Sequence, residues 1–432
     1  RNSHRPLCVL SSYRNAGKDL SMDIGYINFS QEERNNIYKV IQTIRDHQAI
    51  DELGIGRIRD AFSNEMFPGM STLQNRAKYF VLLPALYISA EHEKYKNVNE
   101  VQQRIIDLEI KLTRQLLNGT PDAAERWGIT GSTVINQAEK HSSRYVKYDP
   151  SYIYWGGLVT FGMVKTDGNI YQLIFERSQK NQDKPTRWRS NSNDDFESQD
   201  DEGGSGDFQL CDAGGLKYNF NGRTPIPIQL SKEEATFIKR QIITSENSKD
   251  SFLAYILRND DLPLVPKWLD LGDLWRDIPD NFLIAYTLSA TFSRFTYLLR
   301  TFYNYIYDKK MGNADEAEEI LKHFVEYREE NLQILTKQKI GEVIAYIDDR
   351  VDDYSVKNFC MNAAQYVESN NLDKLEDCII KREKETKGAV RAKLTNWKKY
   401  VGQEHAEAGI LDFRWSLVYS MINEIRKGEQ NG

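Results

Sequence analysis

The stretch "DELGIGRIRDAFSNEMFPGMSTLQNRAKYF", residues 51–80, decides how the first half of this 432-residue chain is built. Apolar residues recur at helical spacing in its first part, and Phe67-Pro68-Gly69 predicts the end of that helix. A second helix is predicted to begin at Ser71 and to end or kink at Pro84. Two helices joined by a tight turn are typical of a DNA-binding helix-turn-helix, but an αα-hairpin that only packs a core has the same pattern.

The polar side chains of this stretch are candidate DNA contacts. Arginine and lysine pair with phosphates, and arginine, asparagine and glutamine also form paired hydrogen bonds with base edges. The candidate nucleic-acid-binding residues here are Arg57, Arg59, Gln74, Asn75, Arg76 and Lys78.

A second DNA-binding motif is predicted from Gly128 to Phe175. "GSTVINQAEK" and "DPSYIYWGGLVTFGMV" indicate two short helices, and "KTDGNIYQLIF" indicates a β-hairpin that turns at Asp167-Gly168. Helices followed by a small hairpin are typical of winged helices, which bind DNA or dock other proteins. Nearby cations are candidate phosphate contacts, namely Arg144, Lys147 and Lys165. The alternative is that the aromatic residues of the second helix form a core face.

The most basic segment is "KREKETKGAVRAKLTNWKK", residues 381–399. One interpretation is a phosphate-facing helix; the other is a solvated helix face whose charge is balanced by Glu383 and Glu385. The candidate contacts are Lys381, Arg382, Lys387, Arg391 and Lys393, with Lys398 and Lys399 also available.

Other patterns predict further helices. Residues 98–119 carry an apolar stripe, Ser231 and Glu234 form a capping-box pattern, and the aromatic-rich residues 280–307 suggest a buried central helix. The predicted fold is therefore mostly α, in the α+β class: bundle-like, with a helix-turn-helix or winged-helix-like N-terminal half and a small β-hairpin.

Composition predicts four segments in the chain. Residues 1–21 are expected to be a non-native or disordered extension, with the natural start at Met22. Residues 22–177 are predicted to form the winged-helix-like domain, 178–225 a flexible acidic, Ser- and Gly-rich loop, and 226–430 a helical C-terminal domain.

Charge and residue spacing exclude several functions. The net charge is −6, so nucleic-acid binding requires a local basic face. The four cysteines and six histidines are scattered, which predicts no metal site, no cofactor and a reducing, cytoplasmic location. No apolar run is long enough to span a membrane.

No catalytic motif is present in the sequence. It lacks the glycine-rich phosphate-binding patterns and the GxSxG nucleophile turn. The remaining enzyme hypothesis is a metal-dependent nuclease that uses Asp167 and Glu176, although Arg177 and Ser178 stand where that pattern needs lysine.

Six blocks of sequence, in order, resemble one prokaryotic family, domain-of-unknown-function family 6361. They are "GYINFSQEER" at 25–34, residues 51–84, "PSYIYWGGLVTFGMV" at 150–164, "FSRFTYLLRTFYN" at 292–304, "IIKREKETKGAVRAKL" at 379–394 and "LDFRWSLVYSMINEI" at 411–425. The resemblance, which extends over residues 22–430, implies an anti-phage defence context, with helicase or nuclease proteins as partners. It implies no catalytic residues.

The predicted function is therefore non-enzymatic. We expect a component of a defence system that binds double-stranded DNA or assembles a complex. The alternatives are the nuclease and a scaffold that binds only proteins.

Overall fold

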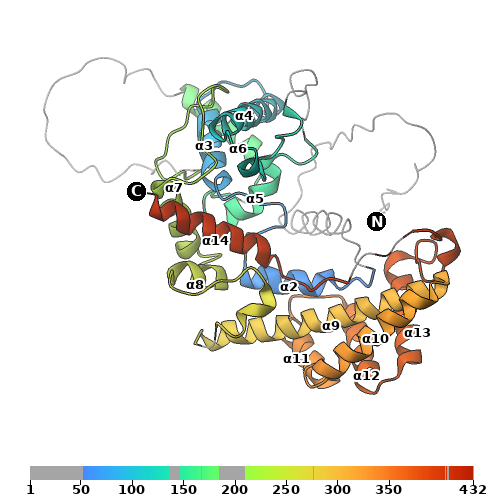
Figure 1. The fold of residues 1–432 in the computed structure, drawn as a ribbon. Helices are drawn as coiled ribbons and strands as arrows, with labels where there is room; N and C mark the ends of the chain where they lie inside the picture. The colour runs from blue at the N-terminus through green and yellow to red at the C-terminus, as the bar shows by residue number, and fades with distance from the viewer. Residues whose placement is uncertain are drawn as a thin grey trace, which may run out of the picture. The chain divides into compact units, whose positions relative to one another are not determined.

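The computed structural model describes residues 52–135, 146–166, 168–183, 210–275, 277–403, 405 and 408–431. Apart from short 3₁₀ turns, these residues form α-helices and no β-strand (Figure 1). The predicted helical fold is confirmed, but the predicted β-hairpin is not present. The helices are α2 Gly56–Met66, α3 Tyr79–Glu91, α4 Val98–Gly119, α5 Pro150–Thr160, α6 Ile170–Asp183, α7 Lys232–Thr244, α8 Phe252–Arg258, α9 Asp280–Met311, α10 Ala314–Asn331, α11 Lys337–Tyr346, α12 Tyr354–Glu368, α13 Leu372–Lys387 and α14 Trp415–Gln430.

The chain consists of two units, residues 1–42 and residues 43–432. Every described residue belongs to the second unit, and the predicted extension at 1–21 and the start at Met22 lie outside the described residues. The core of the second unit draws side chains from before and after residues 178–225, and it includes Leu210 and Cys211. Cys211, Cys360 and Cys378 are free thiols.

The helix-turn-helix prediction is wrong in its second helix. Helix α2 ends at Met66, as the Phe67-Pro68-Gly69 turn predicts, but residues 71–78 form turns and the next helix starts only at Tyr79. Helix α3 then continues through Pro84. Nearly all of its side chains are buried, so we attribute its persistence through proline to packing on all sides.

The winged-helix prediction is also unsupported. Helix α5 begins with Pro150 in its first turn, as predicted. The predicted hairpin is instead helix α6, because the Asn169 side chain accepts a hydrogen bond from Tyr171 N at 2.9 Å and Ile170 and Ile174 lie on one buried face. The only β-bridge among the described residues joins Val164 and Cys211. The Asp167 turn and residues 136–145 lie outside the described residues.

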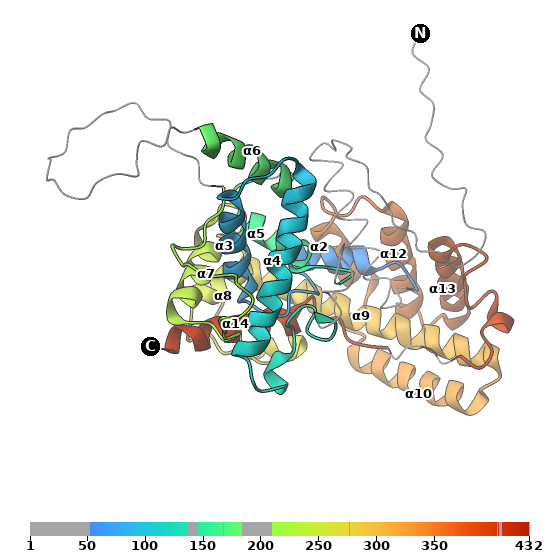
Figure 2. The ribbon, with the colours of Figure 1, turned by 90° about the horizontal axis from the view of Figure 1, so that it is seen from above.

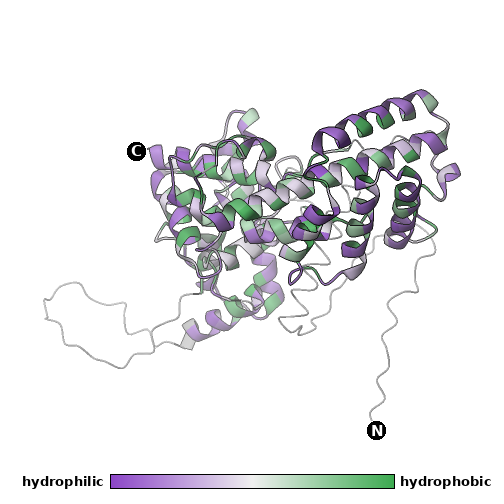
Figure 3. Ribbon diagram, turned by 90° about the horizontal axis from the view of Figure 1, so that it is seen from below, coloured by the Kyte–Doolittle hydropathy of each residue, from purple (hydrophilic) through white to green (hydrophobic). Residues whose placement is uncertain are grey.

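Two predicted helix starts and one long helix are confirmed. Asn97 caps α4, and Ser231 and Glu234 form the expected capping box at the start of α7. Helix α9 is the central element of the C-terminal half, where α10 lies along it (Figure 2). Its aromatic residues are largely buried, and Phe302 packs on Phe324 of α10 at 4.7 Å between ring centroids. Hydrophobic and hydrophilic residues alternate along the helices, as expected when one face is buried (Figure 3).

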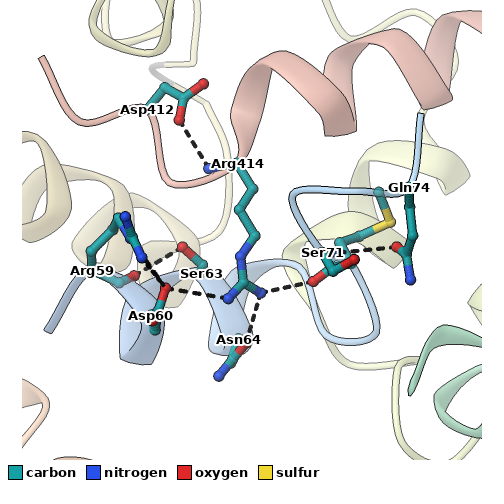
Figure 4. A network of polar contacts seen from close by, with 9 residues as sticks. Arg59, Asp60, Ser63, Asn64, Ser71, Gln74, Asp412 and Arg414 are labelled. Atoms are coloured by element: carbon teal, nitrogen blue, oxygen red, sulfur yellow. Dashed lines mark hydrogen bonds and ion pairs between the residues drawn. The ribbon is translucent and has the colours of Figure 1, made fainter. Parts of the chain in front are cut away.

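Arg414 connects α14 to α2 (Figure 4). Its guanidinium, which is buried, donates hydrogen bonds to Asn64 Oδ1 at 2.8 Å, Met70 O at 2.7 Å and Asp60 Oδ1 at 3.3 Å. Phe413 and Arg414 have φ values of 52° and 69°, a left-handed conformation that costs about 1 kcal/mol or more per non-glycine residue. The hydrogen bonds of Arg414 hold this strained turn in place.

Glu109 is a fully buried carboxyl group on α4. Its Oε1 accepts hydrogen bonds from the Ser151 hydroxyl at 2.6 Å and from Ser151 N at 2.8 Å, whereas Oε2 has no hydrogen-bond partner among the described residues. Burial raises the pKa of Glu109 well above its ordinary value, and the neighbouring Asp149 carboxylate raises it further. The folded protein therefore retains a proton on Glu109 at pH values where the unfolded chain has lost it.

Glu109→Gln is expected to remove one component of the pH dependence of stability. In the wild type, the folded state binds the extra proton, so the free energy of unfolding falls as pH rises from about 4.5 toward the folded-state pKa, by at most about 1.4 kcal/mol per pH unit. Urea denaturation between pH 5 and 8 should show a flatter profile for the variant. Glu319→Gln, at an exposed position on α10, is the control and should leave the profile unchanged. Parallel profiles for the wild type and Glu109→Gln would show that Glu109 is ionised in the folded state.

Candidate nucleic-acid interface

Gln74 and Asn75, predicted as base contacts, lie in the turns before α3. Gln74 is buried: its Oε1 accepts from Ser71 N at 3.0 Å, and its Nε2 donates to Gly69 O at 3.1 Å and Ile153 O at 3.3 Å. Asn75 is half-buried. Gln74 therefore holds the turn and has no free polar atom for a base.

Arg76 and Lys78 also have internal partners. Arg76 pairs with Glu424 on α14 at 2.7 Å and donates to the carbonyls of Glu125 and Trp127. The buried Lys78 ammonium lies 2.6 Å from Glu234 Oε2 and donates to Gln229 O at 3.0 Å. Burial lowers the pKa of Lys78, and the Glu234 carboxylate opposes that shift. Both cations therefore stabilise the fold.

The Lys78–Glu234 pair borders a cleft of about 470 Å³ that is otherwise lined mainly by residues 217–231. The Glu234 carboxylate also accepts hydrogen bonds from the Tyr218 hydroxyl and from Ser231 N. Both oxygens of the Glu234 carboxylate thus accept hydrogen bonds from the 217–231 segment and attach it to α7.

Of the three cations near the predicted winged helix, the structure describes two, Lys147 and Lys165. Arg144 lies outside the described residues. Lys147 is exposed and its Nζ lies 5.0 Å from the centre of the Tyr148 ring. Lys165 is exposed beside the Val164–Cys211 bridge.

Arg57 and Arg59 lie on α2. Arg57 is 61% exposed, and its Nη1 lies 3.0 Å from Asp353 Oδ2, at the start of α12. Arg59 is half-buried and binds the Asp60 carboxylate at 3.0 Å. Arg57 is therefore the more accessible of the two.

The basic segment 381–399 forms the end of α13, a loop and a short 3₁₀ turn at Trp397–Lys399. It is not one continuous helix, because α13 ends at Lys387 and Gly388 follows with φ of 77°. No aspartate or glutamate occurs between Thr386 and Gln403. The charged side chains between these two positions are therefore all lysine or arginine.

Two carboxylates lie beneath this segment. Glu383 is buried and accepts hydrogen bonds from Tyr303 at 2.7 Å, Lys393 N at 2.8 Å and Leu394 N at 2.9 Å. Burial raises the pKa of Glu383, and the Tyr303 hydrogen bond opposes that shift. Glu52 is 12% exposed and pairs with Lys393 at 3.0 Å and Lys387 at 3.6 Å. These two carboxylates are therefore directed inward, whereas Glu385 is exposed and lies 4.0 Å from Lys381.

Arg382 joins the same internal network. It is buried, and it donates to Leu53 O at 2.7 Å and to Ser355 Oγ at 2.9 Å. With Arg382, Lys387 and Lys393 engaged internally, the exposed cations of the segment are Lys381, Lys384, Arg391, Lys398 and Lys399, which we call the basic surface.

The structure brings two sequence-predicted groups together. The start of α2 contacts the end of α13 through Arg382 and Glu52, and Arg57 contacts the start of α12. Arg57 and the α13 part of the basic surface therefore belong to one neighbourhood, whereas Gln74, Arg76 and Lys78 have partners on other segments.

The described residues show no metal-binding cluster of histidine, cysteine and carboxylate side chains. Glu176, the described member of the nuclease hypothesis, lies on helix α6, where its Oε1 accepts from Gln172 Nε2 at 2.7 Å. The strand that this hypothesis requires is therefore a helix. None of the described helices combines the length and apolar character needed to cross a bilayer.

Three residues emerge only from the structure. Lys384 belongs to the basic surface, Tyr354 lies beside it with a 72% exposed side chain, and Arg414 holds the α2–α14 connection. The local sequence does not predict that Tyr354 is exposed at a helix start. It also does not predict that Arg414, between Phe413 and Trp415, joins two distant segments.

Comparison of the chain with the curated proteins and with the solved structures gave no match. The matching protein family is described as a family of unknown function, DUF6361, and its model covers residues 21–202. The blocks at 292–304, 379–394 and 411–425 lie beyond that range, so their resemblance stays a prediction. Over residues 21–202 the resemblance is confirmed: this part of the chain is similar to the family of unknown function DUF6361.

Proposed function

We propose that the chain is a non-enzymatic nucleic-acid-binding component that contacts the phosphate backbone through the basic surface. The observation that carries the proposal is the distribution of charged side chains around residues 381–399, where most carboxylates are turned inward and most cations are exposed. Glu52 and Glu383 are turned inward and satisfied by internal partners, whereas five cations remain exposed against one exposed carboxylate, Glu385, beside Lys381. A cluster of exposed lysine and arginine side chains attracts a polyanion in spite of the net charge of −6.

Phosphate contact fits this arrangement better than base reading does. The residues predicted to read bases are not available on a recognition helix, because Gln74, Arg76 and Lys78 lie before α3 and are engaged within the fold. Cations on a helix end and a loop can follow a backbone without reading its sequence. We therefore propose binding with little sequence preference.

The biological setting that we propose is a prokaryotic anti-phage defence system, in which the chain acts in the cytoplasm with helicase or nuclease partners. It is supported by the resemblance to the family alone. In this setting the chain would hold nucleic acid or assemble a complex, while its partners supply the chemistry.

The salt dependence of binding tests the phosphate-contact mechanism. If the five cations each neutralise one phosphate, raising salt from about 50 to about 200 mM should lower the affinity for duplex DNA roughly 10²–10³-fold. Fluorescence anisotropy with a labelled duplex measures this directly. An affinity that stays constant over this range would contradict the mechanism.

A further inference from the structure

Tyr354 is the first residue of α12, and its ring is not part of the core. The side chain is 72% exposed, and within the described part of the chain it has no hydrogen bond, ring contact or ion pair. The helix start does not depend on the ring, because Asp353 caps it by accepting a hydrogen bond from Val356 N at 3.2 Å. The fold therefore leaves this aromatic face available to a ligand.

The residues on either side of Tyr354 place it next to the cations. Asp353 binds Arg57 of α2 at 3.0 Å. Ser355 accepts a hydrogen bond from Arg382 of α13 at 2.9 Å and lies 3.5 Å from Glu385, one turn after Lys381. The tyrosine thus stands between Arg57 and the end of α13, where the basic surface begins.

The carboxylates in this neighbourhood mostly have cation partners. Asp353 is paired with Arg57, and Glu385 lies 4.0 Å from Lys381, which is itself 80% exposed. Asp348, Asp349 and Asp352 are exposed carboxylates that a nearby phosphate would have to avoid; Asp348 pairs with Lys357 at 2.6 Å, and Asp349 lies 3.8 Å from Arg350. A flat, uncharged base can lie on the Tyr354 ring while its phosphates extend toward Lys381 and Lys384.

We infer that Tyr354 is a stacking platform for an unpaired base, so that the basic surface binds a single-stranded nucleic acid more tightly than a duplex. This inference rests on the proposed function, because the phosphates must be held by the cations. A base in a duplex is already stacked inside the helix and cannot cover the tyrosine, whereas an unpaired base can. Every base has an aromatic face, so such a site binds strands of many sequences.

The test uses the full chain and two labelled ligands, an oligothymidylate of about 30 nucleotides and a duplex of the same length. Tyr354→Ala is expected to weaken single-strand binding about tenfold and duplex binding less than about twofold, because one stacked base is lost. Tyr354→Phe retains the ring and should bind like the wild type. A strand carrying 5-bromodeoxyuridine should also photocrosslink to Tyr354, as mass spectrometry of the peptides would show.

The outcomes separate the inference from the proposed function. If charge reversal at Lys398 and Lys399 abolishes binding but Tyr354→Ala leaves single-strand affinity unchanged and no crosslink forms at Tyr354, the stacking platform is wrong and phosphate binding stands. Equal losses for both ligands in Tyr354→Ala would also overturn the platform. If the wild type binds neither ligand, both proposals fail.

Discussion

Arg414→Ala is expected to lower the free energy of unfolding by about 3–5 kcal/mol, the usual cost of removing one partner from a buried charged network. The buried guanidinium binds Asn64, Met70 O and Asp60, which lie about 350 positions away in the sequence. Without it, the Met70 carbonyl loses its donor and the left-handed turn at Phe413 loses its anchor. Chemical denaturation followed by circular dichroism measures the change.

Arg57→Ala is the matched control for that substitution. Arg57 also pairs with an aspartate far away in sequence, but it is 61% exposed, so its loss should cost less than about 1 kcal/mol. A cost for Arg414→Ala as small as that of Arg57→Ala would show that the Arg414 network does not hold α2 and α14 together.

Lys78→Ala is expected to have a similarly large effect, about 3–5 kcal/mol, because it leaves the Glu234 carboxylate buried without a cation. Lys78→Met combined with Glu234→Gln should recover part of this loss, since the amide oxygen can accept the hydrogen bond from Ser231 N while the amide nitrogen donates one to the Tyr218 hydroxyl. The measurement is again the free energy of unfolding in urea.

Lys249→Ala is the control for the buried pair, because Lys249 and Glu246 form an ion pair at the surface. It should leave the free energy of unfolding close to that of the wild type, because exposed ion pairs contribute little. If Lys78→Ala unfolds at the same urea concentration as the wild type, Lys78 does not stabilise the fold. That result would favour the alternative prediction, that Lys78 contacts nucleic acid.

Local signals predicted much of the helical fold. The apolar stripe of α4, the proline at the start of α5, the Ser231–Glu234 capping box and the aromatic helix α9 are all confirmed. Each depends on residues within a few positions of one another, so a single sequence contains the information.

The errors arose where distant partners decide the structure. The "STLQNRAK" stretch suggested a helix, but Gln74, Arg76 and Lys78 are satisfied by Ile153, Glu424 and Glu234, which are far away in sequence. Asp167-Gly168 suggested a hairpin, but Asn169 and the Ile170–Ile174 spacing favour helix α6. In the same way, the sequence shows which residues of 381–399 are cationic, but not that Glu52 comes from far away in the chain to pair with Lys387 and Lys393.

The most direct test of the central claim is the affinity of a basic-surface variant, Arg391→Glu with Lys398→Glu and Lys399→Glu, for duplex DNA. Its control is Lys232→Glu with Lys322→Glu and Lys339→Glu, three exposed lysines on α7, α10 and α11 that give the same change in net charge. We predict at least about a 100-fold loss of affinity at about 100 mM salt for the basic-surface variant, and less than about threefold for the control. Equal losses in the two variants, or no loss in the first, would contradict the account.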